Sequence, residues 1–199
     1  MTDRISGSAF KQMITFGAAC VTQQKQAIND LNVFPVPDGD TGTNMSLTIQ
    51  TAVNELKKSE PATVGEAAKI TAGALLRGAR GNSGVILSLL FRGLSKSVKG
   101  LTAMDGAQLA AAMAEGVTTA YGAVMKPAEG TVLTVSRLAA ARAVEAAQEN
   151  PSAEYVLEQA IAAGYETLAQ TIDMNPVLKK AGVVDAGGKG YLIIQDGML

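Results

Sequence analysis

The chain has 199 residues, 47% of them hydrophobic, which is enough to bury one core but little for two. Its formal net charge is −1 and its lysines and arginines are scattered, so we expect no nucleic-acid surface and no binding to an anionic membrane. Because there is no histidine and a single cysteine, Cys20, the composition excludes zinc clusters, histidine-dependent triads and disulfides within the chain.

Helical periodicity dominates the chain from its first residues onward. Apolar side chains recur at helical spacing in most segments, and Thr63 with Glu66 has the form of a capping box. The run 85–91 is apolar on all sides, which predicts a central helix or, as the alternative, a buried strand. Breaks are expected at the Asn-Pro pairs 150–151 and 175–176. The predicted helices cover about 8–31, 43–58, 63–77, 85–91, 105–125, 131–150, 152–174 and a shorter piece after 190.

These elements predict an all-α fold, an antiparallel bundle or barrel of about eight helices, because Ala-rich faces at 110–112 and 139–141 allow helices to approach closely. We expect one domain over 1–199 and, from the apolar ending at 195–199, a longer chain with further domains. The N-terminus lacks the apolar run of a signal peptide and no long uninterrupted apolar segment follows. This predicts a cytoplasmic protein without a transmembrane segment.

Two carboxylates, Asp38 and Asp40, lie one residue apart in a loop that runs into the second predicted helix. The prolines before them exclude a helix, and the glycines beside them permit tight turns. Both carboxylates can therefore point toward one hard cation such as Mg²⁺, and the free amides of a helix that begins near Thr43 can accept phosphate oxygens. The loop indicates a metal-phosphate site.

Two plainer interpretations compete with that site. The first is a solvated turn between helices, which is the commonest role of such Asp/Gly clusters and stays open. The second is a calcium loop of the EF-hand type, which requires a glutamate at its twelfth position. Counting from Asp38 leads to Ile49, so the second interpretation fails.

Three further Gly-rich turns lead into predicted helices. The segment 78–84 offers bare amides and a serine hydroxyl to phosphate oxygens, with a helix cap and a closely packed glycine turn as the alternative. It is not a P-loop, because no Gly-Lys-Ser/Thr ends it. The other turns lie at 130–131 and 185–190. In a bundle whose loops gather at one end, all of these turns form one surface.

Three motifs carry a resemblance to a known family: NVFPVPDGDTGTNM at 32–45, GARGNSGVI at 78–86 and VVDAGGKG at 183–190. The chain resembles the DhaL-like nucleotide-binding domain, also called the DAK2 domain, of dihydroxyacetone kinases. The nearest resemblance is to the N-terminal domain of the catalytic subunits of bacterial fatty acid kinases.

The resemblance implies a helical barrel with ATP or ADP at one end, its phosphates joined to the protein through a pair of Mg²⁺ ions. Asp38 and Asp40 match metal ligands and the catalytic pair, and Asn32 matches a third ligand, with Asp30 as the alternative. The residues that match nucleotide-binding turns are Thr41, Thr43, Asn44, Gly81, Asn82, Ser83, Gly84, Thr131 and Asp185.

The implied reaction is transfer of the γ-phosphoryl group of ATP to the carboxylate of a fatty acid, which a separate fatty-acid-binding protein presents. A carboxylate is already ionised at neutral pH and needs no general base, in agreement with the absence of histidine. The alternatives are the ADP-binding subunit of a dihydroxyacetone kinase and a nucleotide-sensing domain without turnover. The domain could be inactive on its own, and a homodimer is left open.

Overall fold

The computed structural model describes residues 1–199 and contains ten helices, with one isolated bridge between Ile5 and Met104 in place of any sheet. Eight helices are long, and two, α2 and α9, have six residues each. The helices are α1 (Gly7–Gln23), α2 (Lys25–Asp30), α3 (Thr41–Leu56), α4 (Val64–Gly78), α5 (Gly81–Ser97), α6 (Gly106–Ala123), α7 (Val132–Glu149), α8 (Ala153–Met174), α9 (Pro176–Ala181) and α10 (Ala186–Met198).

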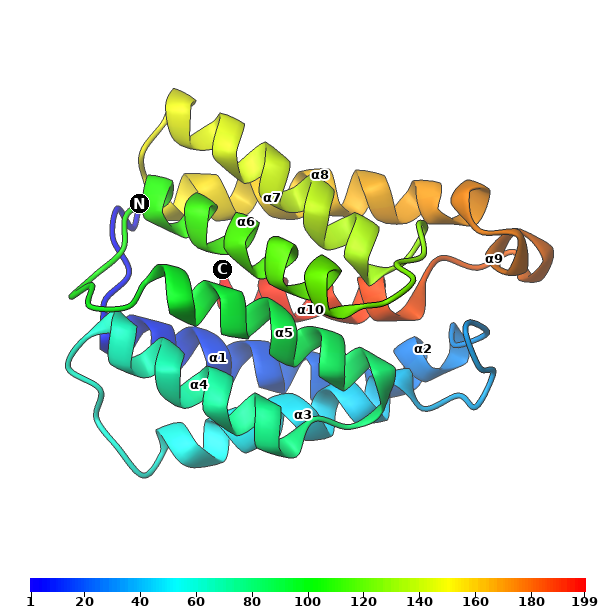
Figure 1. Ribbon diagram of the computed structural model, residues 1–199, viewed down its shortest axis with the longest axis horizontal. Coiled ribbons are helices and arrows are strands. Elements are labelled where there is room, and N and C mark those ends of the chain that lie inside the picture. The colour runs from blue at the N-terminus through cyan, green and yellow to red at the C-terminus, as the bar shows by residue number, and fades with distance from the viewer.

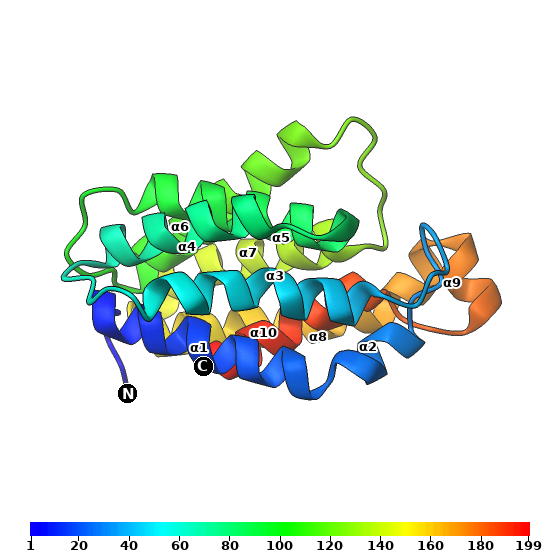
Figure 2. The ribbon, with the colours of Figure 1, turned by 90° about the horizontal axis from the view of Figure 1, so that it is seen from below.

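The long helices run up and down beside one another and close into a barrel (Figures 1 and 2). Helix α1 packs beside α3, each helix from α3 to α8 packs beside the next, and α10 returns from α7 and α8 to α1. The predicted all-α barrel is therefore confirmed. None of its helices is both long enough and apolar enough to span a membrane.

One continuous cluster of 45 buried hydrophobic residues fills the barrel. The alanines of α6 and α7 let the helices approach, as the sequence predicted, and α10 is buried along most of its length. Its Gly190 packs closely against α3, since an added Cβ there would lie 2.5 Å from the Sδ atom of Met45. The core therefore fixes the end of the chain against helices that come much earlier in the sequence.

Several helix boundaries differ from the prediction. The single helix expected over 8–31 divides at Gln24 into α1 and α2. The Asn-Pro pair 175–176, which was expected only to break the chain, also starts α9, with Asn175 as its N-cap and Pro176 as its first residue. The apolar run at 85–91 is the middle of a longer helix, α5, and not a strand. Helix α10 begins four residues before Gly190, because the side chain of Asp185 caps it by accepting a hydrogen bond from the amide of Gly188.

Candidate functional site

Four helix N-termini meet at one cavity of about 530 Å³. Residues from the first turns of α3, α5, α7 and α10 line it, together with the loop before α3 and the loop between α6 and α7. In Figure 1 this is the end of the barrel that carries α2 and α9. Each N-terminus contributes a partial positive charge, so the cavity suits an anion.

Most of the site residues expected from the sequence line this cavity. The structure thus brings together turns that are more than 140 residues apart along the chain. The expected residues in the lining are Asn32, Asp38, Asp40, Thr41, Asn44, Gly81, Asn82, Ser83, Thr131 and Asp185.

Thr43, Gly84 and Asp30 are not in the lining. The amide of Thr43 donates a hydrogen bond to the side chain of Asn29 and its hydroxyl accepts one from the same side chain, so both groups contact α2. Gly84 packs against α3, where a Cβ would lie 2.5 Å from the Oγ1 atom of Thr48. The carboxylate of Asp30 is exposed and accepts a hydrogen bond from Gln26. Contacts between helices therefore account for the positions of Thr43 and Gly84, and exposure to solvent accounts for that of Asp30.

The carboxylates of Asp38 and Asp40 form no ion pair and cap no helix. Asp38 is exposed and Asp40 is half-buried at the N-cap position of α3. No group of three or more acidic, cysteine or histidine side chains gathers anywhere in the structure. Any metal here would therefore need two carboxylates completed by ligand oxygens, which is the arrangement that Mg²⁺ commonly adopts with phosphates.

Asn32 is 6% exposed, and its side-chain amide is used within the loop. Its Oδ1 atom accepts hydrogen bonds from the amides of Asp40 (3.0 Å) and Thr41 (3.1 Å), and its Nδ2 atom donates to the carbonyl of Val36 (2.9 Å). The side-chain oxygen expected to bind a metal thus already serves two donors.

The first turn of α5 is open toward the cavity, because no side chain caps it. Its Gly81 has φ +64°, and a Cβ at that residue would lie 2.5 Å from the Nδ2 atom of Asn44. The turn is tied to α3 through Thr48, whose hydroxyl accepts a hydrogen bond from the amide of Arg80 (3.1 Å) and donates to the carbonyl of Asn44 (2.7 Å). Free amides on a fixed turn are suited to phosphate oxygens.

The loop 124–130 forms another wall and is held by Glu129. The Glu129 carboxylate accepts hydrogen bonds from Thr134 (2.8 Å) and from Arg137 (2.9 Å), and the hydroxyl of Thr134 accepts one from the amide of Gly130 (2.9 Å). This loop carries Lys126, the one lysine or arginine in the lining. None of these four side chains was expected from the sequence, because the contacts of Glu129, Thr134 and Arg137 and the position of Lys126 in the lining appear only when the loop is folded onto α7.

Asp185 lies at the start of α10 and is 5% exposed. Burial raises the pKa of its carboxyl to about 6, although hydrogen bonds from the amides of Gly188 and Val132 oppose that rise. These two amides belong to α10 and α7, so Asp185 joins two of the four helix N-termini at the cavity.

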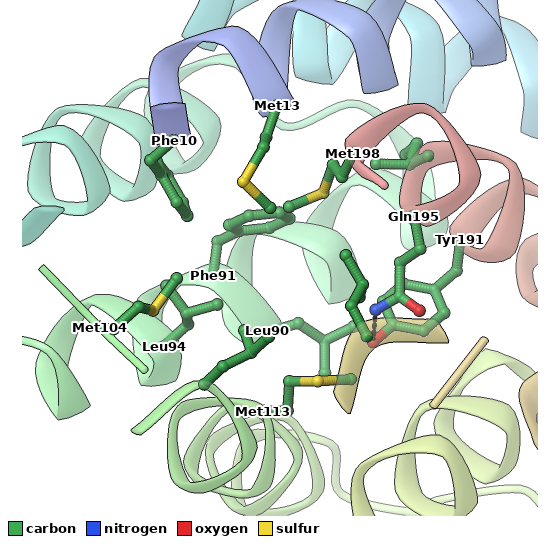
Figure 3. A pocket seen from close by; sticks show the side chains of 13 residues that line it. Phe10, Met13, Leu90, Phe91, Leu94, Met104, Met113, Tyr191, Gln195 and Met198 are labelled. Carbon is green, nitrogen blue, oxygen red and sulfur yellow. Dashed lines mark hydrogen bonds between the residues drawn. The ribbon is translucent and has the colours of Figure 1, made fainter. Parts of the chain in front are cut away.

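A second, much smaller cavity of about 40 Å³ lies inside the barrel (Figure 3). Twelve of its thirteen lining residues are hydrophobic, and the exception is Gln195 on α10. The Nε2 atom of Gln195 donates a hydrogen bond to the hydroxyl of Tyr191 (2.7 Å), but its Oε1 atom has no partner. The cavity therefore holds one unsatisfied polar atom in an otherwise apolar lining.

Comparisons with known proteins place the chain among kinase-related domains. A family model described as the DAK2 domain matches residues 35–199. An uncharacterized protein of Staphylococcus haemolyticus (strain JCSC1435) is 46% identical over 199 residues, and one of Staphylococcus aureus (strain USA300) is 44% identical; the match covers all of this chain and 36% of each relative. The chain thus spans little more than a third of the length of these curated relatives.

A solved structure shares the fold. The crystal structure of the dihydroxyacetone kinase of C. freundii (native form) aligns with a TM-score of 0.63 over 94% of this chain and 33% of that chain, at 17% sequence identity. At this identity the alignment demonstrates a common helical barrel.

Proposed function

Because the chain belongs to the DAK2 domain family, we propose that the cavity at the helix N-termini binds ATP with Mg²⁺ and that the domain transfers the γ-phosphoryl group. The observation that carries this proposal is the meeting of four helix N-termini with the unpaired carboxylates of Asp38 and Asp40 in one cavity of about 530 Å³. Cavities of this size accommodate a nucleotide-sized ligand.

The residues fit a magnesium-bound nucleotide. Asp38 and Asp40 would hold Mg²⁺, which neutralises phosphate charge when it is bound. The open amides at 81–83 and the hydroxyl of Ser83 would bind phosphate oxygens, and Lys126 would add the only side-chain cation. The caps at Thr131 and Asp185 would keep the walls of the cavity in place.

We further propose that the acceptor is the carboxylate of a fatty acid, which a separate fatty-acid-binding protein presents, and that the product is an acyl phosphate. Histidine is absent from the chain, and the aspartates of the cavity have other roles, Asp38 and Asp40 as the proposed metal ligands and Asp185 as the cap of α10, which suits an acceptor that is ionised at neutral pH. Since the chain spans 36% of its relatives, we place acceptor binding and partner docking partly in the rest of the longer protein.

Calorimetric titration of ATP, with and without Mg²⁺, tests the nucleotide site. We expect wild-type binding to require Mg²⁺, and we expect Asp38→Ala and Asp40→Ala each to weaken it at least tenfold, since each removes a charged ligand. Glu60→Ala is the matched control, because it removes an exposed carboxylate that lies outside the cavity. An ATP affinity that is the same without Mg²⁺, or the same in both aspartate variants as in the wild type, would overturn the proposal. Tightly retained ADP in the purified protein would favour the dihydroxyacetone kinase type.

A further inference from the structure

Helix α3 has an aspartate at its N-cap position, Asp40, but the side chain of this aspartate does not cap the helix. Asp40 occupies the N-cap position, where an aspartate side chain normally accepts a hydrogen bond from an amide in the first turn. The Asp40 carboxylate makes no such bond and faces the cavity instead. The amides at the start of α3 must therefore find acceptors elsewhere.

Two asparagines from outside the helix supply these acceptors. The Oδ1 atom of Asn29 accepts a hydrogen bond from the amide of Thr43 (3.0 Å), and its Nδ2 atom donates to the hydroxyl of the same threonine (3.0 Å). Asn32 accepts from the amides of Asp40 and Thr41 at 3.0 and 3.1 Å. Three backbone donors are thus satisfied without the use of a carboxylate.

Both asparagines are held in place by their surroundings. Asn29 lies on α2, which contacts α3 so closely at Gly42 that a Cβ there would overlap the carbonyl of Lys25. Asn32 is buried, and its donor is fixed by the carbonyl of Val36 within the same loop. The short helix α2 therefore carries one cap, and the loop that follows it carries the other.

We propose that Asn29 and Asn32 are positioning residues that cap α3 in place of Asp40, so that the Asp40 carboxylate stays free for a cation. This inference rests on the proposed Mg-ATP site. It differs from the ligand role that the sequence suggested for Asn32, because the Oδ1 atom of Asn32 already accepts two hydrogen bonds. It also gives a function to Asn29, which does not line the cavity.

The caps are tested first without metal or nucleotide, by amide hydrogen exchange in the 199-residue chain. Asn29→Ala should speed exchange of the Thr43 amide, and Asn32→Ala should speed exchange of the Asp40 and Thr41 amides, each by about tenfold. Asp40→Asn should leave all three amides protected. Unchanged exchange in both alanine variants would overturn the capping role.

The consequence for the cation is tested by titrating Mg²⁺ and ATP into the same variants. Asn29→Ala and Asn32→Ala should weaken Mg²⁺-dependent ATP binding by similar factors of about ten, whereas Asp40→Asn should remove the Mg²⁺ dependence. Thr63→Ala removes the cap of α4, which lies outside the cavity, and should leave ATP binding unchanged.

Two results would separate the possible failures. If Asn32→Ala removes Mg²⁺ dependence as Asp40→Asn does, while Asn29→Ala has no effect, Asn32 is a ligand and the inference is wrong. If the wild-type chain binds no Mg-ATP, the proposed function fails, and the metal-free exchange rates still decide whether the two asparagines cap α3.

Discussion

The carboxyl group of Asp185 is buried at the edge of the candidate site, and because its pKa is raised, the free energy of unfolding depends on pH. The folded chain holds this proton more tightly than the unfolded chain, so protonation stabilises the fold. The contribution is complete below about pH 4 and is lost as the pH rises through about 6, a change of about 3 kcal/mol.

Asp185→Asn should remove this dependence, because asparagine can still cap α10 but does not titrate. We expect the free energy of unfolding of the variant, relative to wild type, to rise by about 3 kcal/mol between pH 4 and pH 7, as measured by urea unfolding. Asp105→Asn alters another capping carboxylate, at α6, and serves as the control. An equal rise in both variants would contradict the assignment to Asp185.

Lys126 is the one cation that lines the cavity, on a loop that Glu129 ties to α7. We expect Lys126→Ala to weaken ATP binding by about tenfold at low salt and by less at high salt, since an exposed charge is screened. Lys126→Arg should keep most of the affinity. Lys180→Ala, an exposed lysine outside the lining, is the calorimetric control, and an equal loss there would point to net charge alone.

Among single residues, the sequence identified those whose role is indicated by the residues next to them in the chain. Asp38 and Asp40 stand out because the two carboxylates flank a single glycine in one short loop. Asn29, Thr48 and Thr134 could not be identified, because each is an ordinary helical residue until its partner in another turn is known.

Among the elements, the turn between α4 and α5 makes two demands on one residue, Gly81. Gly81 needs both a positive φ and room for the side chain of Asn44. Gly81→Ala should therefore lower the free energy of unfolding by about 1–3 kcal/mol and also weaken ATP binding. Gly100→Ala is the matched control, because Gly100 has φ +82° but nothing within 4 Å of an added Cβ.

Thermal or urea unfolding and calorimetry separate the two effects of Gly81→Ala. Both variants should share the backbone strain, but only Gly81→Ala should affect the ligand. If Gly100→Ala weakens ATP binding as much as Gly81→Ala does, the loss of affinity does not come from the contact between residue 81 and Asn44.

The long helices could be predicted because their periodicity and caps are local signals, as the capping box of Thr63 and Glu66 illustrates. The short helices α2 and α9 could not, since six residues carry too little periodicity. The start of α10 was hidden for a different reason. Glycines that look like a flexible turn are helical there because α10 packs tightly on α3 and α7.

In the molecule as a whole, the small apolar cavity inside the barrel contains one polar pair, Tyr191 and Gln195 (Figure 3). Tyr191→Phe and Gln195→Met should each cost about 1–3 kcal/mol, because each leaves the other residue without its partner. The double variant should cost less than either single change, since it leaves no unpaired polar group in the cavity. Urea unfolding of all four proteins measures this coupling, and additive losses would contradict it.

The fold class followed from composition and periodicity, but the closure of the barrel did not. Closure places α10 between α1 and the pair α7 and α8, and this pairing joins the two ends of the sequence. No local pattern encodes such a pairing. We expected the four turns to meet only if the helices form a bundle whose loops gather at one end. The up-and-down order of the helices places the four turns at the same end of the barrel.

The same up-and-down order divides the four helix N-termini at the cavity equally between the two halves of the chain. The first half, through α5, provides the N-termini of α3 and α5, and the second half provides those of α7 and α10. The connection between the halves passes through the exposed Gly100, far from the cavity. A chain cut there would yield two fragments that each hold two of the four helix N-termini, so a ligand of the cavity would stabilise their reassembly.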